Sequence, residues 1–325
     1  ARSARTRARD GDAAASSPSR ARVLADLALG NGLGAADIAA LFDGRGHAPA
    51  PLDDGERALI EALSGRALDT GDMPDWVAHE IPVWMDDPLK RALGADFAAE
   101  MTALNGPAPL DLRVNALKTD REAARAALAR DGIDAEPTPY SPWGLRLASR
   151  VDLNAVRAFR DGWVEVQDEG SQLVSLMTDA RPGMAVVDYC AGAGGKTLAL
   201  AAPLQGSGSL IACDVAKSRL ARMGGRLKRA GAGGVERHCL ADEADSWLEA
   251  ARGTADRVLL DVPCTATGTW RRTPETRWQL TPARLDDHVA RQRRILAAAA
   301  ELVKPGGRLI YATCSLLDEE NEAQM

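Results

Sequence analysis

Short apolar runs alternate with longer amphipathic stretches through the second half of the chain. The apolar runs span residues 185–188, 209–212, 258–261 and 308–311, and a further strand is expected to end near Leu240. Helical patterns lie between them, at residues 196–202, 217–230 and 282–303. Strands and helices in alternation form a parallel sheet with helices on both faces. The pattern therefore predicts an α/β fold, a doubly wound Rossmann-like domain, over residues 169–325.

The first half of the chain has a different texture. Leucine-rich amphipathic stretches predict a helical region over residues 21–105. From residue 111 the expected order is a strand (112–115), a helix (121–130), a hairpin around Gly144, a short helix near Val156 and a strand (163–166). This βαββαβ-like order predicts a small α+β module, similar to an RNA-recognition motif, over residues 106–168.

The two ends of the chain lead to separate expectations. Residues 1–20 are rich in Arg, Ala and Ser, which favours a disordered basic arm over an amphipathic transit peptide. At the other end, one further helical stretch follows the last apolar run. A seven-stranded sheet would need two more strands, so we expect the domain over 169–325 to lack its last strands.

Composition narrows the class of protein. Hydrophobic residues make up 46% of the chain and charged residues 26%, and no apolar run approaches the roughly 20 residues that span a bilayer. The five cysteines show no C-x-x-C spacing, which argues against a zinc site and a disulfide framework. We therefore expect a cytoplasmic monomer with neither a membrane partner nor a bound metal.

Charge does not exclude a nucleic-acid partner. The net charge of −6 argues weakly against one, but the basic residues are clustered. One cluster, within residues 217–229, contains Lys217, Arg219, Arg222, Arg226, Lys228 and Arg229. This run either binds phosphate or forms a solvated helix face, and the sequence leaves both possibilities open.

A glycine-rich turn follows the first predicted strand. Its candidate ligand-binding residues are Cys190, Ala191, Gly192, Ala193, Gly194, Gly195 and Lys196. A P-loop requires glycine at position 190, and a dinucleotide fingerprint requires it at position 197, so both motifs fail. Asp214 ends the next strand, where a carboxylate can hold a ribose diol, and Asp242 follows the third strand, where it can bond an adenine amino group. A nucleoside such as S-adenosylmethionine fits, although both aspartates also suit helix caps or turns.

Two cysteines follow apolar runs that are expected to be neighbouring strands. Cys264 and Cys314 would then lie at the same edge of the sheet, where strands are about 4.8 Å apart, and both thiols can face one substrate atom. Thiolate attack at C6 of a pyrimidine makes C5 a nucleophile that accepts a methyl group, with an acid near N3 and a base for the C5 proton. The alternative for a free cysteine is a small buried hydrophobe, which we expect for the side chains of Cys190, Cys213 and Cys239.

The motifs around these residues resemble one family. They are Asp188-Tyr-Cys-Ala-Gly-Ala-Gly-Gly-Lys-Thr197, Asp261-Val-Pro-Cys-Thr-Ala-Thr-Gly268, Arg271-Arg-Thr-Pro-Glu275, Tyr311-Ala-Thr-Cys-Ser315, Leu112-Arg-Val-Asn-Ala-Leu-Lys118 and Val166-Gln-Asp-Glu-Gly-Ser171. Over about residues 75–325 the chain resembles the bacterial 16S rRNA cytosine-C5 methyltransferases of the Sun/Fmu (RsmB) group, within the wider NOL/NSUN superfamily. Ala193 departs from the family pattern, which usually has proline there.

The resemblance implies roles for individual residues and a class I methyltransferase fold. Cys314 would be the nucleophile, Cys264 would assist release of the product, and Asp261 would lie near N3 of the cytosine and near the methyl donor. Residues 190–196, Asp214, Asp242 and Asp261 would hold S-adenosylmethionine. A DNA cytosine-C5 methyltransferase would place its nucleophile at Cys264, whereas the second thiol, at Cys314, favours the RNA type.

The expected substrate is RNA. Trp270, Arg271 and Arg272 can stack an unpaired base and bind phosphate, or they can be a core tryptophan beside two surface arginines. The target cytosine must leave its stack to reach a narrow crevice. The resemblance implies small-subunit rRNA, with possible RNA binding by residues 21–105. The alternatives are a transfer RNA methyltransferase and a non-catalytic RNA-binding assembly factor with the same fold.

Overall fold

The computed structural model describes residues 18–66 and 73–325. The chain divides into two compact units, Ala1–Asn105 and Gly106–Met325. The described part of the first unit is helical. Its elements are α2 (Pro18–Ala25), η1 (Asp26–Gly30), α3 (Ala35–Leu41), α4 (Asp54–Leu63), α5 (Asp75–Ala78), η2 (Val83–Met85), α6 (Asp86–Leu93), η3 (Gly94–Asp96) and α7 (Phe97–Asn105).

The first unit buries apolar side chains between α2, α3 and α4. Leu24, Ile38 and Ile60 belong to one core and are at most 1% exposed. A capping box starts α4, because the Asp53 side chain accepts a bond from the Glu56 amide and the Glu56 side chain accepts one from the Asp53 amide. These reciprocal bonds satisfy amides that have no partner inside the helix.

The expectation of a disordered arm over residues 1–20 is wrong at its last three positions. Residues 1–17 lie outside the described residues, but α2 begins at Pro18. Arg20 Nε donates to Glu56 Oε1 at 2.5 Å, and the Glu56 side chain is buried. A buried carboxylate needs such a partner, so tertiary pairing extends the helix into the basic segment.

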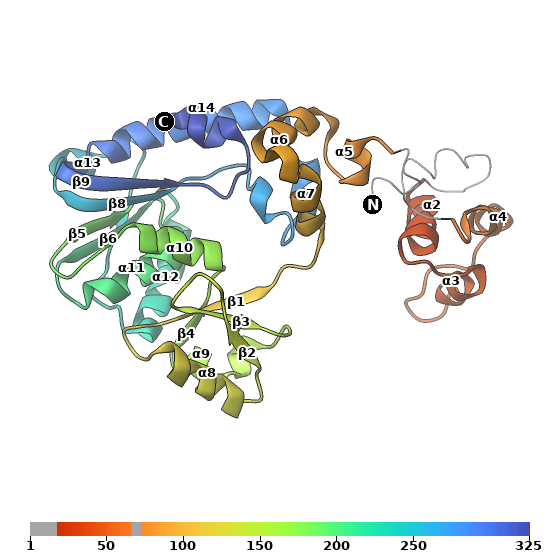
Figure 1. Ribbon diagram of the computed structural model, residues 1–325, viewed down its shortest axis with the longest axis horizontal. Coiled ribbons are helices and arrows are strands. Elements are labelled where there is room, and N and C mark those ends of the chain that lie inside the picture. Colours follow the sequence, from red (N-terminus) through yellow and green to blue (C-terminus); the bar gives the residue numbers. More distant parts are fainter. Residues whose placement is uncertain (1–17, 67–72) are drawn as a thin grey trace. The chain divides into compact units, whose positions relative to one another are not determined.

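The second unit begins with a small antiparallel sheet (Figure 1). Its strands run in the order β2-β3-β1-β4, and every pairing between them is antiparallel. Buried side chains from α8 and from the sheet form one core, which includes Leu112, Leu128 and Leu145. The elements are β1 (Leu110–Val114), α8 (Arg121–Arg130), β2 (Ala135–Pro137), β3 (Gly144–Leu147), η4 (Leu153–Ala155), α9 (Arg157–Arg160) and β4 (Val164–Val166).

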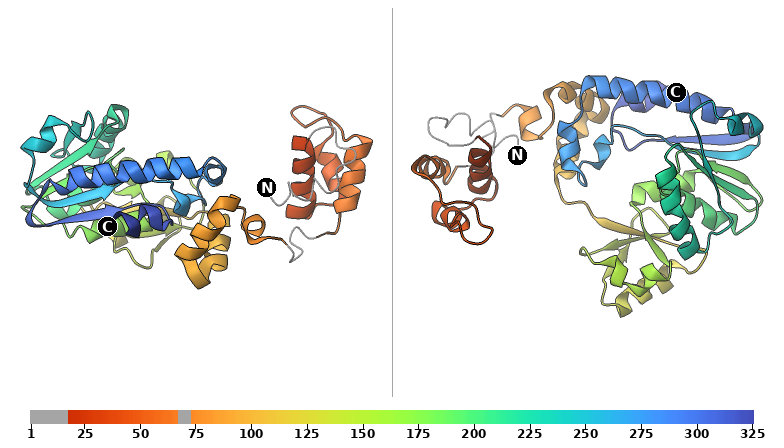
Figure 2. Two further views of the ribbon diagram at one scale, coloured as in Figure 1. Left: turned by 90° about the horizontal axis from the view of Figure 1, so that it is seen from above. Right: turned by 180° about the vertical axis from the view of Figure 1, so that it is seen from behind.

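The rest of the second unit is a five-stranded parallel sheet in the order β7-β6-β5-β8-β9. Figures 1 and 2 show α14 on one face of the sheet and α11 and α12 on the other. The elements are α10 (Glu169–Met177), β5 (Ala185–Asp188), α11 (Gly195–Leu204), β6 (Ser209–Asp214), α12 (Lys217–Ala230), β7 (Glu236–Cys239), α13 (Ser246–Ala250), β8 (Ala255–Asp261), η5 (Thr267–Thr269), η6 (Pro274–Trp278), α14 (Pro282–Ala300), β9 (Val303–Ala312), η7 (Asp318–Glu320) and η8 (Glu322–Gln324). The predicted doubly wound α/β fold is therefore confirmed.

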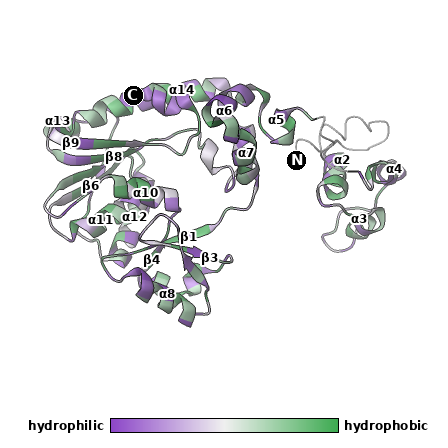
Figure 3. Ribbon diagram, viewed as in Figure 1, coloured by the Kyte–Doolittle hydropathy of each residue, from purple (hydrophilic) through white to green (hydrophobic). Residues whose placement is uncertain are grey.

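Two cores lie on opposite faces of this sheet. Leu198 of α11 and Met223 of α12 belong to one core, and Leu248 of α13 and Ile295 of α14 belong to the other. Figure 3 shows hydrophobic residues along most of α11, whereas hydrophobic and hydrophilic residues alternate along α14. This difference follows burial, because α14 exposes one face and α11 buries six of its ten residues.

The prediction is wrong at the junction between α14 and β9. The pattern predicts a helix to residue 303 and a strand from residue 308, but α14 ends at Ala300 and β9 begins at Val303. Val303 pairs with Ala255, and the next pairing joins Arg308 to Arg257, so the residues between bulge out of the ladder. The Pro-Gly-Gly segment that reads as a turn before the strand is a bulge within it.

Candidate active site

The predicted site residues gather where the parallel strands end. A cavity of about 630 Å³ lies there, lined among others by Cys190, Asp214, Asp242, Asp261, Cys264 and Cys314. Ligand cavities in proteins are typically about 300–1,000 Å³. The strand order changes direction at β5, so this edge is the crevice in which doubly wound sheets bind ligands.

The two sulfur atoms predicted to act together are neighbours. Asp261 pairs with Ala312 at the ends of β8 and β9, and Cys264 and Cys314 follow a few residues later. Cys264 Sγ lies 3.3 Å from Cys314 Sγ, within hydrogen-bond distance, and both thiols are free. Cys314 is exposed and Cys264 is half-buried. The structure thus brings one accessible sulfur and one supporting sulfur to the same point.

The environment gives the two thiols opposite protonation preferences. The hydrogen bond with Cys264 holds the pKa of Cys314 below its ordinary value, and Lys196 also lowers it, whereas burial and the Asp261 carboxylate raise it. The same bond, together with burial, raises the pKa of Cys264. Because the thiolate is the nucleophilic form of cysteine, Cys314 is the more reactive thiol of the pair. The structure therefore shows which contact lowers the pKa of Cys314, which the sequence does not reveal.

Asp261 is paired with the lysine of the glycine-rich turn. Lys196 Nζ lies 2.7 Å from Asp261 Oδ2, and its side chain is 14% exposed against 35% for Asp261. Lys196 also donates to Ser171 Oγ, at 3.4 Å. The ion pair fixes a carboxylate at the cavity wall, close to the sulfur pair.

The glycine-rich turn adopts a conformation that needs glycine. Gly192 and Gly194 have φ values of +56° and +85°. A side chain at Gly194 would also come within 2.5 Å of Met223. Gly194 caps the N-terminus of α11, so the turn leads into the first turn of a helix, where backbone amides have no partner inside the helix.

Asp214 and Asp242 both line the cavity and both also make local backbone bonds. Asp214 is 7% exposed and accepts bonds from the Gly192 amide at 2.9 Å and from the Ala216 amide at 2.7 Å. Asp242 is exposed and accepts a bond from the Ala244 amide at 2.7 Å. The turn and cap roles expected as the alternative are therefore present, and each carboxylate keeps further lone pairs for a ligand.

Two arginines that were not predicted as site residues donate hydrogen bonds to backbone carbonyls of the glycine-rich turn. Arg226 Nη1 donates to the Ala193 carbonyl at 2.7 Å, and Arg113 Nη1 donates to the Gly195 carbonyl at 2.8 Å. Arg113 comes from β1 of the small sheet and is 3% exposed. Burial lowers its pKa to about 10, so the guanidinium remains charged at neutral pH. In the sequence, the only indication of a role for Arg113 is that it belongs to the Leu112-Arg-Val-Asn motif.

Glu165 of β4 pairs with arginines of α12 and so joins the small sheet to that helix. Glu165 lies opposite Arg113 in the antiparallel pairing and accepts two bonds from Arg229, at 2.7 and 2.9 Å. Arg226 lies 3.4 Å from the same carboxylate. Two members of the basic run are thus occupied by contacts with the small sheet, and Lys217, Arg219, Arg222 and Lys228 remain exposed.

Two buried acids that were not predicted as site residues also support this edge. Asp188 is 1% exposed; Thr197 donates to one of its oxygens at 2.6 Å, and the other has no partner among the described residues. Burial raises the pKa of Asp188 to about 7. Glu320 is fully buried and accepts bonds from the Thr265 amide and from Gln292, both at 2.9 Å. Glu320 therefore fixes the segment that follows Cys264.

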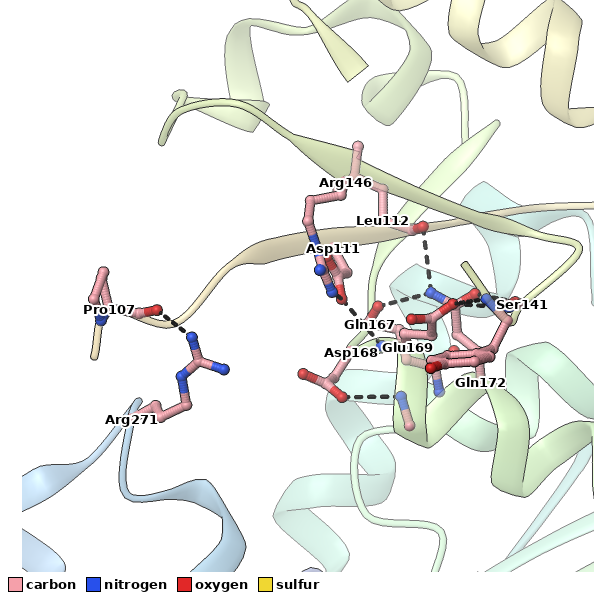
Figure 4. A network of polar contacts seen from close by, with 12 residues as sticks. Pro107, Asp111, Leu112, Ser141, Arg146, Gln167, Asp168, Glu169, Gln172 and Arg271 are labelled. Atoms are coloured by element: carbon pink, nitrogen blue, oxygen red, sulfur yellow. Dashed lines mark hydrogen bonds and ion pairs between the residues drawn. The ribbon is translucent and has the colours of Figure 1, made fainter. Parts of the chain in front are cut away.

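The structure corrects the expectation that Trp270 stacks a base. Trp270 is fully buried, and the Arg277 guanidinium lies 4.9 Å from the centre of its ring. The alternative, a core tryptophan beside two surface arginines, is the one observed. Arg271 donates to the Pro107 carbonyl at 2.7 Å (Figure 4). Arg272 donates to Asp168, also at 2.7 Å, and both arginines are exposed.

The remaining cysteines follow the expectation only in part. Cys213 is buried and Cys190 is half-buried, as small apolar side chains often are. Cys239 is exposed, so the expectation of a buried thiol is wrong there. Cys239 ends β7, the edge strand of the sheet, and therefore has a neighbouring strand on one side only.

Within residues 18–66 and 73–325, no group of three or more His, Cys, Asp or Glu side chains is placed to hold a metal ion. No helix in the same part of the chain is long and apolar enough to cross a membrane.

Two family models match the chain. The model described as 16S rRNA methyltransferase RsmB/F matches residues 175–325. The model described as the ferredoxin-like domain of RsmF/B-like methyltransferases matches residues 81–154. The matched segments contain both sulfurs, the glycine-rich turn and most of the small sheet.

Two curated relatives carry the name ribosomal RNA small subunit methyltransferase B. The protein from Pseudomonas putida is 34% identical over 300 residues, which cover 92% of this chain and 67% of the relative. The protein from Pectobacterium atrosepticum is 36% identical over 252 residues, which cover 75% of this chain and 56% of the relative. The chain therefore spans between about half and two thirds of the length of these relatives.

A solved structure has a similar fold over most of the chain. It is described as a methyltransferase homolog protein from Pyrococcus horikoshii, with a TM-score of 0.66 and 29% identity. The similarity covers 77% of this chain and 78% of that protein.

Proposed function

Because the chain belongs to the RsmB/F family of 16S rRNA methyltransferases, we propose that it methylates C5 of a cytosine in small-subunit rRNA with S-adenosylmethionine as methyl donor. The observation that carries this proposal is the pair of sulfurs, 3.3 Å apart, at the mouth of a cavity that also contains Asp261. An activated thiol with a carboxyl group beside it provides two of the three groups (thiol, acid and base) that C5 methylation of a pyrimidine requires.

The residues around the cavity suit S-adenosylmethionine. Four acidic residues (Asp214, Asp242, Glu243 and Asp261) line it against two arginines (Arg219 and Arg291), and this excess of negative charge favours a cationic nucleoside over a nucleotide with several phosphates. The glycine-rich turn provides amides for the carboxylate end of such a ligand. Residues 190–196, Asp214, Asp242 and Asp261 would hold the ligand. When bound, it supplies an electrophilic methyl group on a sulfonium sulfur.

The reaction begins with the exposed thiolate. Cys314 Sγ attacks C6 of the cytosine and forms a carbon–sulfur bond, and the electron pair of the C5–C6 double bond moves toward N3. In this proposal Asp261 lies near N3 of the ring, and a proton delivered there through Asp261 and its partner Lys196 balances the charge that develops. The ring then carries a nucleophilic carbon at C5, which would take the methyl group as the bond between that group and the sulfonium sulfur breaks and a neutral thioether is released.

Release of the product reverses the first bond. A base removes the C5 proton, the C5–C6 double bond forms again, and Cys314 leaves as a thiolate. Cys264 assists this step because its thiol lies within hydrogen-bond distance of the departing sulfur and stabilises the anion. The same contact that lowers the pKa of Cys314 before the reaction therefore favours its departure at the end.

The RNA contacts proposed for this site are ionic. Arg271 and Arg272 are exposed, and Arg272 lies beside a cavity that also contains Lys196 and Asp261. Guanidinium groups in this position can exchange their protein partners for phosphate oxygens of the RNA backbone.

A methyl-transfer assay tests the proposal. The purified chain is incubated with S-adenosylmethionine that carries a labelled methyl group and with unmodified small-subunit rRNA or unmodified transfer RNA. We expect label in the rRNA alone, and bisulfite sequencing should map it to a cytosine. Label in transfer RNA alone would instead support the transfer RNA alternative, and RNA binding without any transfer would support an assembly factor.

A further inference from the structure

We propose that Tyr140 is a stacking platform for an unpaired RNA base that lies beside the target cytosine. The proposal rests on the RNA-methyltransferase function and extends it by identifying a contact with the substrate. It also gives a position for base stacking in place of Trp270, which is buried.

The exposure of Tyr140 is unusual for an aromatic side chain. Tyr140 is 76% exposed, twice as much as Trp278 at 38%, and Tyr189 is 3% exposed. Burying an aromatic ring contributes strongly to stability, so a folded protein gains little from a tyrosine displayed in this way. An aromatic side chain with an exposed face does, however, suit stacking with a base.

The backbone that carries Tyr140 is held firmly. The amides of Tyr140 and Ser141 donate to the same oxygen of Glu169, at 2.7 and 2.8 Å. Ser141 Oγ bonds with Gln172 at 2.7 Å, and Arg121 donates to the Ser141 carbonyl at 3.2 Å. The backbone of this segment is therefore already ordered. Only the Tyr140 side chain has to be ordered when a ligand binds, so the entropic cost is low.

The fixed segment is joined through Glu169 to the part of the chain that lines the site. Glu169 is the first residue of α10, and Figure 4 shows Ser141, Glu169 and Asp168 close together at that end of the helix. Asp168 and Ser171 line a cavity of about 350 Å³ together with Lys196, Asp261 and Arg272. Asp261 and Cys190 line this cavity and the larger one alike, so the two cavities adjoin.

Two partly exposed guanidinium groups, each paired with a carboxylate, lie on elements joined to the segment that carries Tyr140. Arg146, which pairs with Asp111, keeps 43% of its side chain exposed, and Arg272, which pairs with Asp168, keeps 39% exposed. An aromatic face with guanidinium groups nearby is the combination that binds single-stranded nucleic acid, because the ring stacks on a base and the cations attract phosphates.

The test compares four substitutions of Tyr140 with one control. Tyr140→Phe and Tyr140→Trp keep an aromatic face, whereas Tyr140→Leu keeps apolar bulk without one and Tyr140→Ala removes both. Met177→Ala is the matched control, since Met177 is 63% exposed and lies at the opposite end of α10. Methyl transfer to a small-subunit rRNA transcript gives kcat and KM for RNA, filter binding gives the Kd for the same transcript, and calorimetry gives the Kd for S-adenosylmethionine.

We expect Tyr140→Ala and Tyr140→Leu to raise both the KM and the Kd for RNA by about tenfold, the range of one base–aromatic stack. The affinity for S-adenosylmethionine should stay within about twofold of the wild-type value, and Phe or Trp should restore RNA binding. RNA values for Tyr140→Ala that match those of Met177→Ala would overturn the proposal, as would full recovery with Leu. If the wild-type chain transfers no methyl group, the proposed function fails, and the filter-binding series still decides the role of Tyr140.

Discussion

The two sheets of the second unit treat their polar groups differently. In the small antiparallel sheet, Asp111 receives two bonds from Arg146, at 2.7 and 2.9 Å, and just after β1 the side-chain nitrogen of Asn115 donates to two carbonyls. At the carboxyl end of the parallel sheet, one oxygen of Asp188 has no partner among the described residues, and Cys314 is exposed. The first sheet uses these polar groups for structure, whereas the second leaves an exposed sulfur at its edge.

The difference shows how the two sheets share the work of the site. Reactive groups follow the ends of parallel strands, where they meet at one edge. The small sheet contributes none of the reactive groups, but Arg113 reaches from β1 to the glycine-rich turn. The small sheet therefore positions the glycine-rich turn, and the parallel sheet carries the groups proposed to react.

The largest effect should come from the exposed sulfur. Cys314→Ala removes the proposed nucleophile, so we expect the rate of methyl transfer to fall at least about a thousandfold. The affinity for S-adenosylmethionine should change by less than about twofold, because the thiol contributes no hydrogen bond that this ligand needs. Single-turnover transfer and calorimetry measure the two quantities. Transfer that survives Cys314→Ala but is lost in Cys264→Ala would reverse the roles of the two thiols.

A loss of cofactor affinity should follow removal of the carboxylate that ends β6. Asp214→Ala removes the proposed ribose contact and the bonds to the Gly192 and Ala216 amides. We expect the Kd for S-adenosylmethionine to rise by about ten- to a hundredfold, the range for loss of bonds to a charged group. An unchanged calorimetric affinity would refute the ribose role.

A smaller loss of cofactor affinity should follow removal of the bond between Arg226 and the glycine-rich turn. Arg226→Gln removes the charged donor to the Ala193 carbonyl, and we expect the Kd for S-adenosylmethionine to rise by about three- to tenfold. Arg222→Gln, an exposed position on the same helix, is the matched control and should leave the Kd unchanged. Equal affinities for the two variants would remove the positioning role from Arg226.

The pH dependence of transfer should sharpen the comparison between the two sulfurs. The hydrogen bond from Cys264 lowers the pKa of Cys314, so the thiolate persists to lower pH than an ordinary thiol allows. Activity should therefore be lost only as the pH falls through this lowered pKa. In Cys264→Ala the pKa of Cys314 should rise, and the acid limb of single-turnover transfer should move to higher pH. An acid limb that stays in place would show that another group lowers the pKa.

The sequence predicts the reactive edge better than it predicts its supports. Strand ends follow from apolar runs and turn residues, so the alternation places Cys264, Cys314 and Asp214 at one edge. The bonds from Arg113 and Arg226 join elements about 80 and 30 residues apart, and no local pattern records such contacts. Side-chain pairing across a fold becomes visible only in three dimensions.

The burial of aromatic residues is also hard to predict from the sequence. Trp270 next to two arginines suits a stacking residue and a core residue equally well, because local sequence does not show which side the ring faces. The buried Arg277 beneath the ring settles its position. Tyr140 belongs to no recognised motif. Its exposure depends on the conformation of its loop, which Glu169 of α10 fixes.

The most direct test of the central claim is to identify the sulfur that bonds to the RNA. Cys264→Ala should impair release, so incubation with rRNA and S-adenosylmethionine should accumulate a protein–RNA adduct, visible as a slow band on a denaturing gel. Nuclease and protease digestion followed by mass spectrometry should find the nucleotide on the peptide that contains Cys314. A nucleotide attached to Cys264 in the Cys314→Ala variant, with none on Cys314 in Cys264→Ala, would contradict the account.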